Sequence, residues 1–505
     1  MSNTKTIRAA VTVVLIVACL GIWPAVVNGG PFYMADTPSY FRAAASAAFK
    51  VFGIKTAWLQ EYFRLYANVP RIAQFSSNSN ASEIPVTLSG RSIYYGFLLF
   101  MGYLAGSTWI VVVFQSLLTA ISIYLTILLI CRAQGRAISL GAALAIGAAI
   151  ALLTSASFSI SYLMPSVFTG LGLMAVSNLL FLWRWQLRPE KWFWCAVLGY
   201  SVLVHSTNLL LFTALVIVAL IAGILGSIRF AAVQVISVLM CLTVGILGQA
   251  AFSHAVKVST GAPPVRPPFV ATRLIADGPG YAYLRRHCTS EPYIYCRVLR
   301  QTHPYSDDLL WSKDPQVSLF RGLTPAEQRI SAAQETAFVR AVAAEFPIQV
   351  FASAAKNSFL QLIRLDLAVY NYSDGNRERF GETMPTSVLA SMVPTRAWNE
   401  TMPVSATEIT SAILALASSI YLIVFSARST NPRSLRAYTL SMLFVIVFNA
   451  VVCGALSGPK GRYSNRIVWV LPAVAGALLI RRRKASSSEK EPAAVPRNSE
   501  IAAMR

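Results

Sequence analysis

Residues 192–226 read WFWCAVLGYSVLVHSTNLLLFTALVIVALIAGILG and contain no Asp, Glu, Lys or Arg. About 20 apolar residues in a helix are enough to cross the hydrocarbon core of a bilayer. This stretch is too long for one crossing, and the polar segment from His205 to Asn208 interrupts it near its middle. We therefore predict two membrane-spanning helices joined by a tight turn at one membrane face.

The composition of the whole chain agrees with a membrane protein. Of 505 residues, 55% are hydrophobic and 13% are charged, whereas soluble proteins carry about 25% charged residues. This excludes a soluble globular protein, a disordered protein and a nucleic-acid-binding domain, so we expect no nucleic acid partner. The apolar runs are continuous rather than alternating, which favours helices over a membrane barrel.

We predict an all-α polytopic membrane protein with about ten transmembrane helices. Eight spans besides the hairpin are read from hydropathy: 9–27, 108–130, 137–153, 162–183, 230–252, 406–426, 437–457 and a short one at 467–480. The formal net charge is +22. With ten spans, most basic loops fall on one side, which the positive-inside rule identifies as the cytoplasm. Both termini are then cytoplasmic, and the expected location is a bacterial inner (plasma) membrane.

This topology divides the chain into four parts. Residues 1–252 form a transmembrane module with a first external loop at 28–107, and 253–405 form a small mixed extracytoplasmic domain. Residues 406–484 hold the last helices, and 485–505 form a disordered cytoplasmic tail rich in Ser, Glu, Ala and Pro. An oxidising compartment would permit a disulfide between Cys288 and Cys296, with two free thiols as the alternative.

The first external loop holds a candidate catalytic acid. It opens as GGPFYMADTPSY at 29–40, and Asp36 is its only acid before Glu61. Apolar residues then recur at helical spacing, which predicts an amphipathic helix lying in the membrane interface. Pro38 fits the first helical position, so Thr37 would be the cap and Asp36 would be free for chemistry. The alternative is that Asp36 caps this helix.

A second candidate site is the loop GPKGRYSNR at 458–466. The predicted topology makes it external, yet it carries Lys460, Arg462 and Arg466 and no acid. This departure from the charge bias indicates a specific anionic ligand at the membrane face, because arginine grips phosphate with two parallel hydrogen bonds. Tyr463 adds a hydroxyl and an aromatic face. Alternatively, a neighbouring span is misassigned and the loop is cytoplasmic.

Two further residues are weaker candidates. Arg91 precedes an apolar stretch at 97–105 that is too short to cross a membrane, so we expect a re-entrant or interfacial helix with Arg91 at its outer end; a simple interfacial anchor is the alternative. His205 could line a pocket with Asn208, or could be a satisfied membrane histidine. No cluster of metal-ligand residues is present, so a divalent metal is possible but has no predicted ligands.

The arrangement resembles the GT-C superfamily of integral membrane glycosyltransferases, of the protein mannosyltransferase and lipid A aminoarabinose transferase type. The matching features are an acid early in the first external loop (Asp36), two interfacial helices, a late external domain and an Arg-Tyr pair (Arg462-Tyr463) near the final span. Thr37 stands where that type commonly has a second acid. His205 stands where a lysine is often found.

The resemblance implies a sugar donor linked to polyprenyl phosphate and a glycan, lipid or protein acceptor outside the cytoplasm, with membrane lipid around the protein. Asp36 would be the general base, giving inversion. The residues expected to bind substrate are Arg91, Tyr40, His205, Lys460, Arg462, Tyr463 and Arg466. The competing interpretations are a flippase or transporter for a lipid-linked sugar, and a polysaccharide polymerase or ligase.

Overall fold

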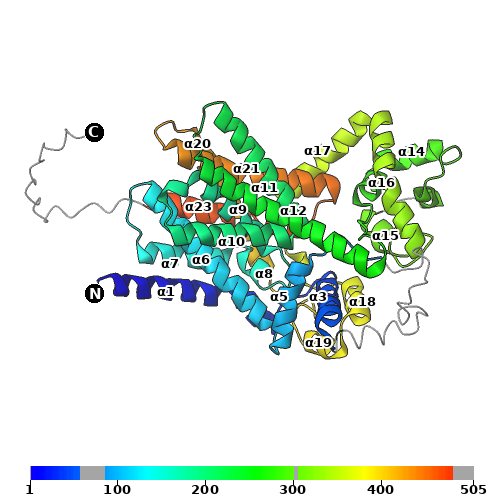
Figure 1. The fold of residues 1–505 in the computed structure, drawn as a ribbon, viewed down its shortest axis with the longest axis horizontal. Helices are drawn as coiled ribbons and strands as arrows, with labels where there is room; N and C mark the ends of the chain where they lie inside the picture. The colour runs from blue at the N-terminus through cyan, green and yellow to red at the C-terminus, as the bar shows by residue number, and fades with distance from the viewer. Residues whose placement is uncertain (1, 57, 59–85, 301–304, 481–505) are drawn as a thin grey trace, which may run out of the picture.

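The computed structural model describes residues 2–56, 58, 86–300 and 305–480 (Figure 1). Every regular element within them is a helix, and the only β pairings there are two isolated bridges, Phe32 with Tyr162 and Leu88 with Val265. The predicted disordered tail at 485–505 lies outside the described residues. The chain is therefore an all-α protein in the part that the structure describes.

The helices of the N-terminal half are α1 Ser2–Gly21, α2 Trp23–Asn28, α3 Thr37–Phe52, α5 Ile93–Leu104, α6 Trp109–Ala133, α7 Leu140–Leu153, α8 Ala156–Ile160, α9 Val167–Phe181, η2 Trp183–Trp185, α10 Arg188–Val204, α11 Ser206–Ile224 and α12 Ala232–Thr260. The later ones are α13 Phe269–Ala276, α14 Pro279–His287, η3 Ile294–Arg300, α15 Ser306–Trp311, α16 Pro325–Glu345, α17 Pro347–Ile363, η4 Ala368–Tyr370, α18 Asp374–Thr383, α19 Thr386–Met392, α20 Ser405–Ala427, α21 Arg433–Leu456, α22 Gly461–Asn465 and α23 Val470–Leu479.

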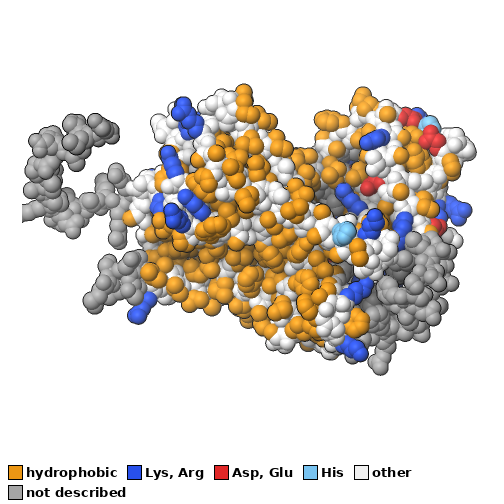
Figure 2. All heavy atoms as spheres, in the orientation of Figure 1, with side chains coloured by type: hydrophobic (Ala, Val, Ile, Leu, Met, Phe, Trp, Pro, Cys, Tyr) orange, Lys and Arg blue, Asp and Glu red, His pale blue; other side chains and the backbone are white. Residues whose placement is uncertain are grey.

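Six of these helices are long and apolar enough to cross a membrane. They are Ile7–Asn28, Trp109–Ala133, Ser206–Ile224, Ala232–Thr260, Ser405–Ala427 and Arg433–Leu456. The count is seven if α16 and α17, which meet at a bend of 108°, form one broken span. The chain is therefore a multi-span helical membrane protein, and Figure 2 shows hydrophobic side chains covering the helical bundle.

The expected count of about ten spans is not reached because several apolar stretches fold into shorter helices. The predicted span at 162–183 contains Pro165, and its helix α9 begins only at Val167. Its 15 residues rise about 22 Å, less than the roughly 30 Å of hydrocarbon. The predicted hairpin does form two helices, α10 and α11, which meet at His205, but only α11 is long and apolar enough to cross a membrane.

The mixed character predicted for residues 253–405 is not borne out, because their described residues form helices, irregular segments and one isolated bridge at Val265. Helices α14, α15 and α16 lie at the end of the molecule opposite both termini (Figure 1). They share a separate hydrophobic core, whose buried members include Tyr283, Tyr295 and Phe338. A disulfide joins Cys288 to Cys296 beside this core.

The helix after Asp36 packs against protein along the face that we expected to lie on lipid. Ala44, Ala45 and Ala48 of α3 are buried together with Phe100 of α5. Small side chains allow two helices to approach closely. Only the end of α3 keeps large apolar side chains exposed, so α3 and α5 form a packed pair that fixes the segments before each helix.

Helix α17 connects α14, α15 and α16 to the bundle by packing closely on α21. A Cβ atom added to Gly454 of α21 would lie 2.8 Å from the carbonyl carbon of Asn357 and 2.9 Å from the Cα of Ser358, both in α17. Those are backbone atoms, which cannot move away as a flexible side chain can. The absence of a side chain at Gly454 therefore permits this contact.

We expect Gly454→Ala to lower the apparent midpoint of thermal unfolding, measured on the purified protein in nanodiscs. Overpacking of this kind costs about 1–3 kcal/mol. The matched control is Gly199→Ala in α10, where an added Cβ meets nothing within 4 Å and where alanine favours the helix by about 0.5–1 kcal/mol. Equal midpoints for the two variants would contradict the close contact between α17 and α21.

Candidate functional site

Asp36 lies immediately before α3 and makes no capping hydrogen bond, although it occupies the N-cap position. The expectation that Thr37 is the cap is wrong by one residue. The Thr37 hydroxyl accepts a hydrogen bond from the Met34 N–H (2.9 Å) and donates one to the Leu163 carbonyl (3.2 Å), so it holds the preceding segment instead. The Asp36 carboxylate is left free to turn toward α5.

Asp36 forms an ion pair with Arg91, which precedes α5. The Arg91 Nη2 atom donates to the Asp36 Oδ1 atom at 2.6 Å, and the two side chains are only 16% and 14% exposed. Arg91 is thus neither a simple anchor nor a lone cation at the surface. Among the described residues, the second carboxylate oxygen of Asp36 has no hydrogen-bond donor.

The basic loop at 458–466 folds over the end of α21 and is held by amides from two sides. Gln361 of α17 donates to the Lys460 carbonyl (3.0 Å) and to the Ser464 hydroxyl (2.7 Å). Asn449 of α21 donates to the Tyr463 carbonyl at 2.9 Å. These bonds fix the short helix α22, and so they fix the positions of Arg462 within it and of Arg466 directly after it.

Arg462 extends from α22 toward the segment that carries Asp36. Its Nη1 atom contacts the sulfur of Met34, and its Nη2 atom donates to the Tyr463 hydroxyl at 3.1 Å. The guanidinium carbon lies 4.9 Å from the centre of the Tyr463 ring. The structure therefore brings together Arg462 and the Asp36 segment, which are more than 400 residues apart in the chain.

Arg466 and His205 form a second, deeper part of the same cluster. Arg466 is only 3% exposed, and its Nη2 atom donates to the Asn449 Oδ1 atom at 2.7 Å. Its Nη1 atom lies 3.4 Å from the His205 Nε2 atom. The predicted hairpin turn thus reaches the basic loop from another side. Burial, together with the charges of Arg466 and Arg91, lowers the pKa of His205 to about 3, so the imidazole is neutral.

The structure adds Arg379 of α18, which the sequence analysis missed. Arg379 acts electrostatically on Asp36, and Asp36 and Arg91 act on it in turn. Its position had no signal in the sequence, because it lies in a polar stretch, DGNRERFGET, without a recognisable motif. It comes near Asp36 only because the segment around Tyr372 packs into the main core beside Phe32.

The other predicted residues divide between the cluster and its surroundings. Tyr40 lies close to Arg91 and Asp36, and burial raises its pKa to about 12, against the opposing charge of Arg91. Its hydroxyl therefore keeps its proton at neutral pH. Lys460 points away, because its ammonium is paired with Asp307 of α15 at 2.7 Å. We define the arginine cluster as Asp36 with Arg91, Arg379, Arg462 and Arg466.

The arginine cluster carries more positive charge than its one acid balances. Of its four arginines, only Arg91 forms a salt bridge with a described residue. Three of them, Arg91, Arg462 and Arg466, have a buried Nε atom without a hydrogen-bond partner in the described part of the chain, and so does the Tyr162 hydroxyl beside them. Buried polar groups are almost always satisfied. Donors and charge together point to an anion as the ligand.

The electrostatics of the cluster keep Asp36 ionised. Burial alone would raise the pKa of this carboxyl, but the charges of Arg91, Arg462 and Arg379 outweigh burial and lower it below the ordinary value of 3.8. An ionised carboxylate can accept a proton. No group of three or more His, Cys, Asp or Glu residues that could hold a metal ion occurs among the described residues.

Comparison with known proteins gives no relative for this chain: no family model, no curated protein and no solved structure matches it. What is established of its class is a multi-span helical membrane protein. The resemblance to the GT-C superfamily therefore enters below as part of a proposal, which depends on the arginine cluster.

We expect the stability that Asp36 contributes to be constant from pH 8 to pH 5. A carboxylate with a lowered folded-state pKa stabilises the protein above its unfolded-state pKa, about 3.9, and loses this contribution as pH falls through the folded value. The difference in unfolding midpoint between the native chain and Asp36→Asn should thus shrink only below about pH 4. Shrinkage between pH 7 and pH 5 would contradict the ion pair.

Proposed function

We propose that this protein is a membrane glycosyltransferase that moves a sugar from a polyprenyl-phosphate donor to an extracytoplasmic acceptor, with inversion. The observation that carries the proposal is the arginine cluster, a half-buried to buried group of four guanidiniums with one carboxylate. A cation-rich site suits a phosphate, and a lone carboxylate beside it suits a base. The resemblance to the GT-C type supports the same reaction.

In the proposed reaction, an oxygen of the acceptor forms a bond to the anomeric carbon as the bond from that carbon to the phosphate oxygen breaks. The acceptor proton goes to Asp36, and the electron pair of the broken bond stays with the polyprenyl phosphate. The phosphate gains a second negative charge in this step. Arg462 and Arg466 would stabilise this developing charge, since preorganised donors act most strongly where charge appears.

The proposal includes the finer topology of about ten spans. Helices α7, α9, α10 and α23 would add four crossings or partial crossings to the six long helices. Both the Asp36 segment and the basic loop would then lie at the extracytoplasmic face. A donor that is held in the outer leaflet by its polyprenyl tail would present its phosphate at this depth.

This topology predicts the accessibility of two engineered cysteines that flank α20. Thr401 and Ser429 are exposed residues just before and just after this helix. We expect a membrane-impermeant maleimide added to intact cells, or to spheroplasts if an outer membrane excludes it, to label Thr401→Cys and to reach Ser429→Cys only after permeabilisation. The reverse pattern would place Asp36 on the cytoplasmic side and would exclude an extracytoplasmic transferase.

We expect Asp36→Asn to reduce sugar transfer by roughly 10²–10⁴-fold, the usual contribution of a general base, while binding of polyprenyl phosphate is retained. The substrates are lipid-linked sugars extracted from native membranes. Mass spectrometry measures the polyprenyl phosphate that is released from them. The matched control is Asp314→Asn, which changes an exposed carboxylate of the external helices and should leave transfer unchanged. Full activity of Asp36→Asn would remove its assignment as base.

Arg462→Ala separates donor binding from the chemistry. We expect this substitution to raise the KM for the lipid-linked sugar. The control is Arg285→Ala, which should leave this KM unchanged because Arg285 is exposed on the external helices. A flippase would instead move the lipid-linked sugar across vesicles without releasing polyprenyl phosphate. Mass spectrometry of lipids that co-purify with the protein would identify the carrier directly.

A further inference from the structure

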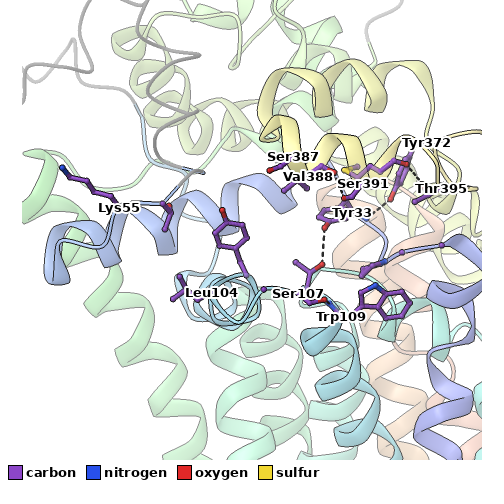
Figure 3. A pocket seen from close by; sticks show the side chains of 18 residues that line it. Tyr33, Lys55, Leu104, Ser107, Trp109, Tyr372, Ser387, Val388, Ser391 and Thr395 are labelled. Atoms are coloured by element: carbon purple, nitrogen blue, oxygen red, sulfur yellow. Dashed lines mark hydrogen bonds between the residues drawn. The ribbon is translucent and has the colours of Figure 1, made fainter.

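A groove lined by both hydroxyl-bearing and apolar side chains opens beside the segment that carries Asp36, apart from the arginine cluster. It lies between α19 on one side and the corner where α5 turns into α6 on the other, and its volume is about 680 Å³ (Figure 3). None of the cluster's five residues lines it. We call it the outer groove and describe it by Tyr33, Lys55, Ser107, Trp109, Ser391 and Thr395, which line it.

The lining of the outer groove suits sugar hydroxyls better than a phosphate. It combines hydroxyl side chains with the rings of Tyr33 and Trp109, and Lys55 is its only charged residue among those that the structure describes. Hydroxyl groups both donate and accept hydrogen bonds, as sugar hydroxyls do, and aromatic faces offer apolar contact. The arginine cluster, by contrast, offers several cations. The two sites therefore differ in the chemistry of the ligand that they can hold.

An apolar path leads from the outer groove along the outside of the bundle. Helix α6 begins at Trp109, and on its next turn Ile110, Val113 and Phe114 are 48%, 43% and 43% exposed. These three residues recur at helical spacing, so they share one face. Since α6 is long and apolar enough to cross a membrane, this exposed apolar face is suited to contact with lipid. A ligand in the groove could extend an apolar tail along it.

One short segment joins the outer groove to the arginine cluster. Tyr33 lines the groove, with its hydroxyl 3.3 Å from the Thr108 hydroxyl and its N–H donating to the Tyr372 hydroxyl at 2.8 Å. Asp36 follows only three residues later, which limits the separation of the two Cα atoms to about 11 Å. The groove and the residue that carries the carboxylate are therefore neighbours along one short segment of the chain.

We infer that the outer groove binds the sugar head group of a membrane-embedded glycolipid, which is the acceptor of the transfer. This inference rests on the proposed function and narrows its acceptor from any glycan, lipid or protein to a lipid that carries a polyhydroxylated head group. The acceptor tail lies along α6, the head group fills the groove, and one of its hydroxyls reaches Asp36.

The test compares two reporter cysteines on α19, Ser391→Cys inside the groove and Ala390→Cys on an exposed position that does not line it. Both are made in a chain in which Cys19 and Cys195 are replaced by serine, since the other free cysteines are buried. The protein is reconstituted in phosphatidylcholine nanodiscs. The rate of labelling by a water-soluble maleimide is measured without amphiphile, with octyl glucoside below its micellar concentration, and with octyl phosphocholine.

We expect octyl glucoside to slow labelling of Ser391→Cys at least threefold and to leave Ala390→Cys unchanged, with no effect of octyl phosphocholine on either. Equal protection by both amphiphiles, or none by the glucoside, would overturn the inference. In the transfer assay, Ser391→Trp should raise the KM for the acceptor and leave the KM for the donor unchanged. The control, Ala390→Trp, should change neither KM. An unchanged acceptor KM would also overturn it.

Failure of the proposed function would look different. If Asp36→Asn remained fully active while octyl glucoside still protected Ser391→Cys, the groove would stand as a sugar site and the transferase proposal would fall. If Asp36→Asn lost transfer while the glucoside gave no protection, the transferase would stand and the acceptor would have to bind elsewhere.

Discussion

The rest of the site depends on one unbalanced set of charges, four guanidiniums around a single carboxylate at one end of a helical bundle. Only Arg91 has an acidic partner in the described chain. Like charges repel more strongly where water is excluded, and the arginines can stay close only because other elements hold them. Asn449 and Gln361 supply this support through neutral amide hydrogen bonds, which fix positions without cancelling charge.

The support comes from parts of the chain that are distant in sequence. Helix α17 belongs to the region between the spans, yet it packs on α21 and bonds to the basic loop. Lys460 ties the same loop to α15 through Asp307. Helices α15 and α17 thus help to build the site, because any movement of α17 would displace α22 and the Arg466 that follows it.

Features of the site that reside in short local patterns could be predicted, and those created by packing could not. The hairpin at His205, the isolated acid Asp36 and the basic loop stand out from apolar surroundings in the sequence. Arg379 does not, because nothing local indicates that its helix packs beside Asp36. The direction of the Lys460 side chain likewise could not be predicted, because it depends on Asp307, which is distant in sequence. Fewer long helices than predicted spans are present in the described chain, because hydropathy measures the length of an apolar stretch and not that of its helix.

The ion pair between Asp36 and Arg91 poses a problem for catalysis that the surplus of arginines can solve. A carboxylate with a lowered pKa is ionised but is a weak base, and Arg91 occupies one of its oxygens. In the proposed reaction, the donor phosphate competes with Asp36 for the Arg91 guanidinium. Its negative charge also offsets Arg462, so the pKa of Asp36 rises when the donor is bound. The base would therefore gain strength only when there is a sugar to transfer, which favours binding of the donor before proton transfer from the acceptor.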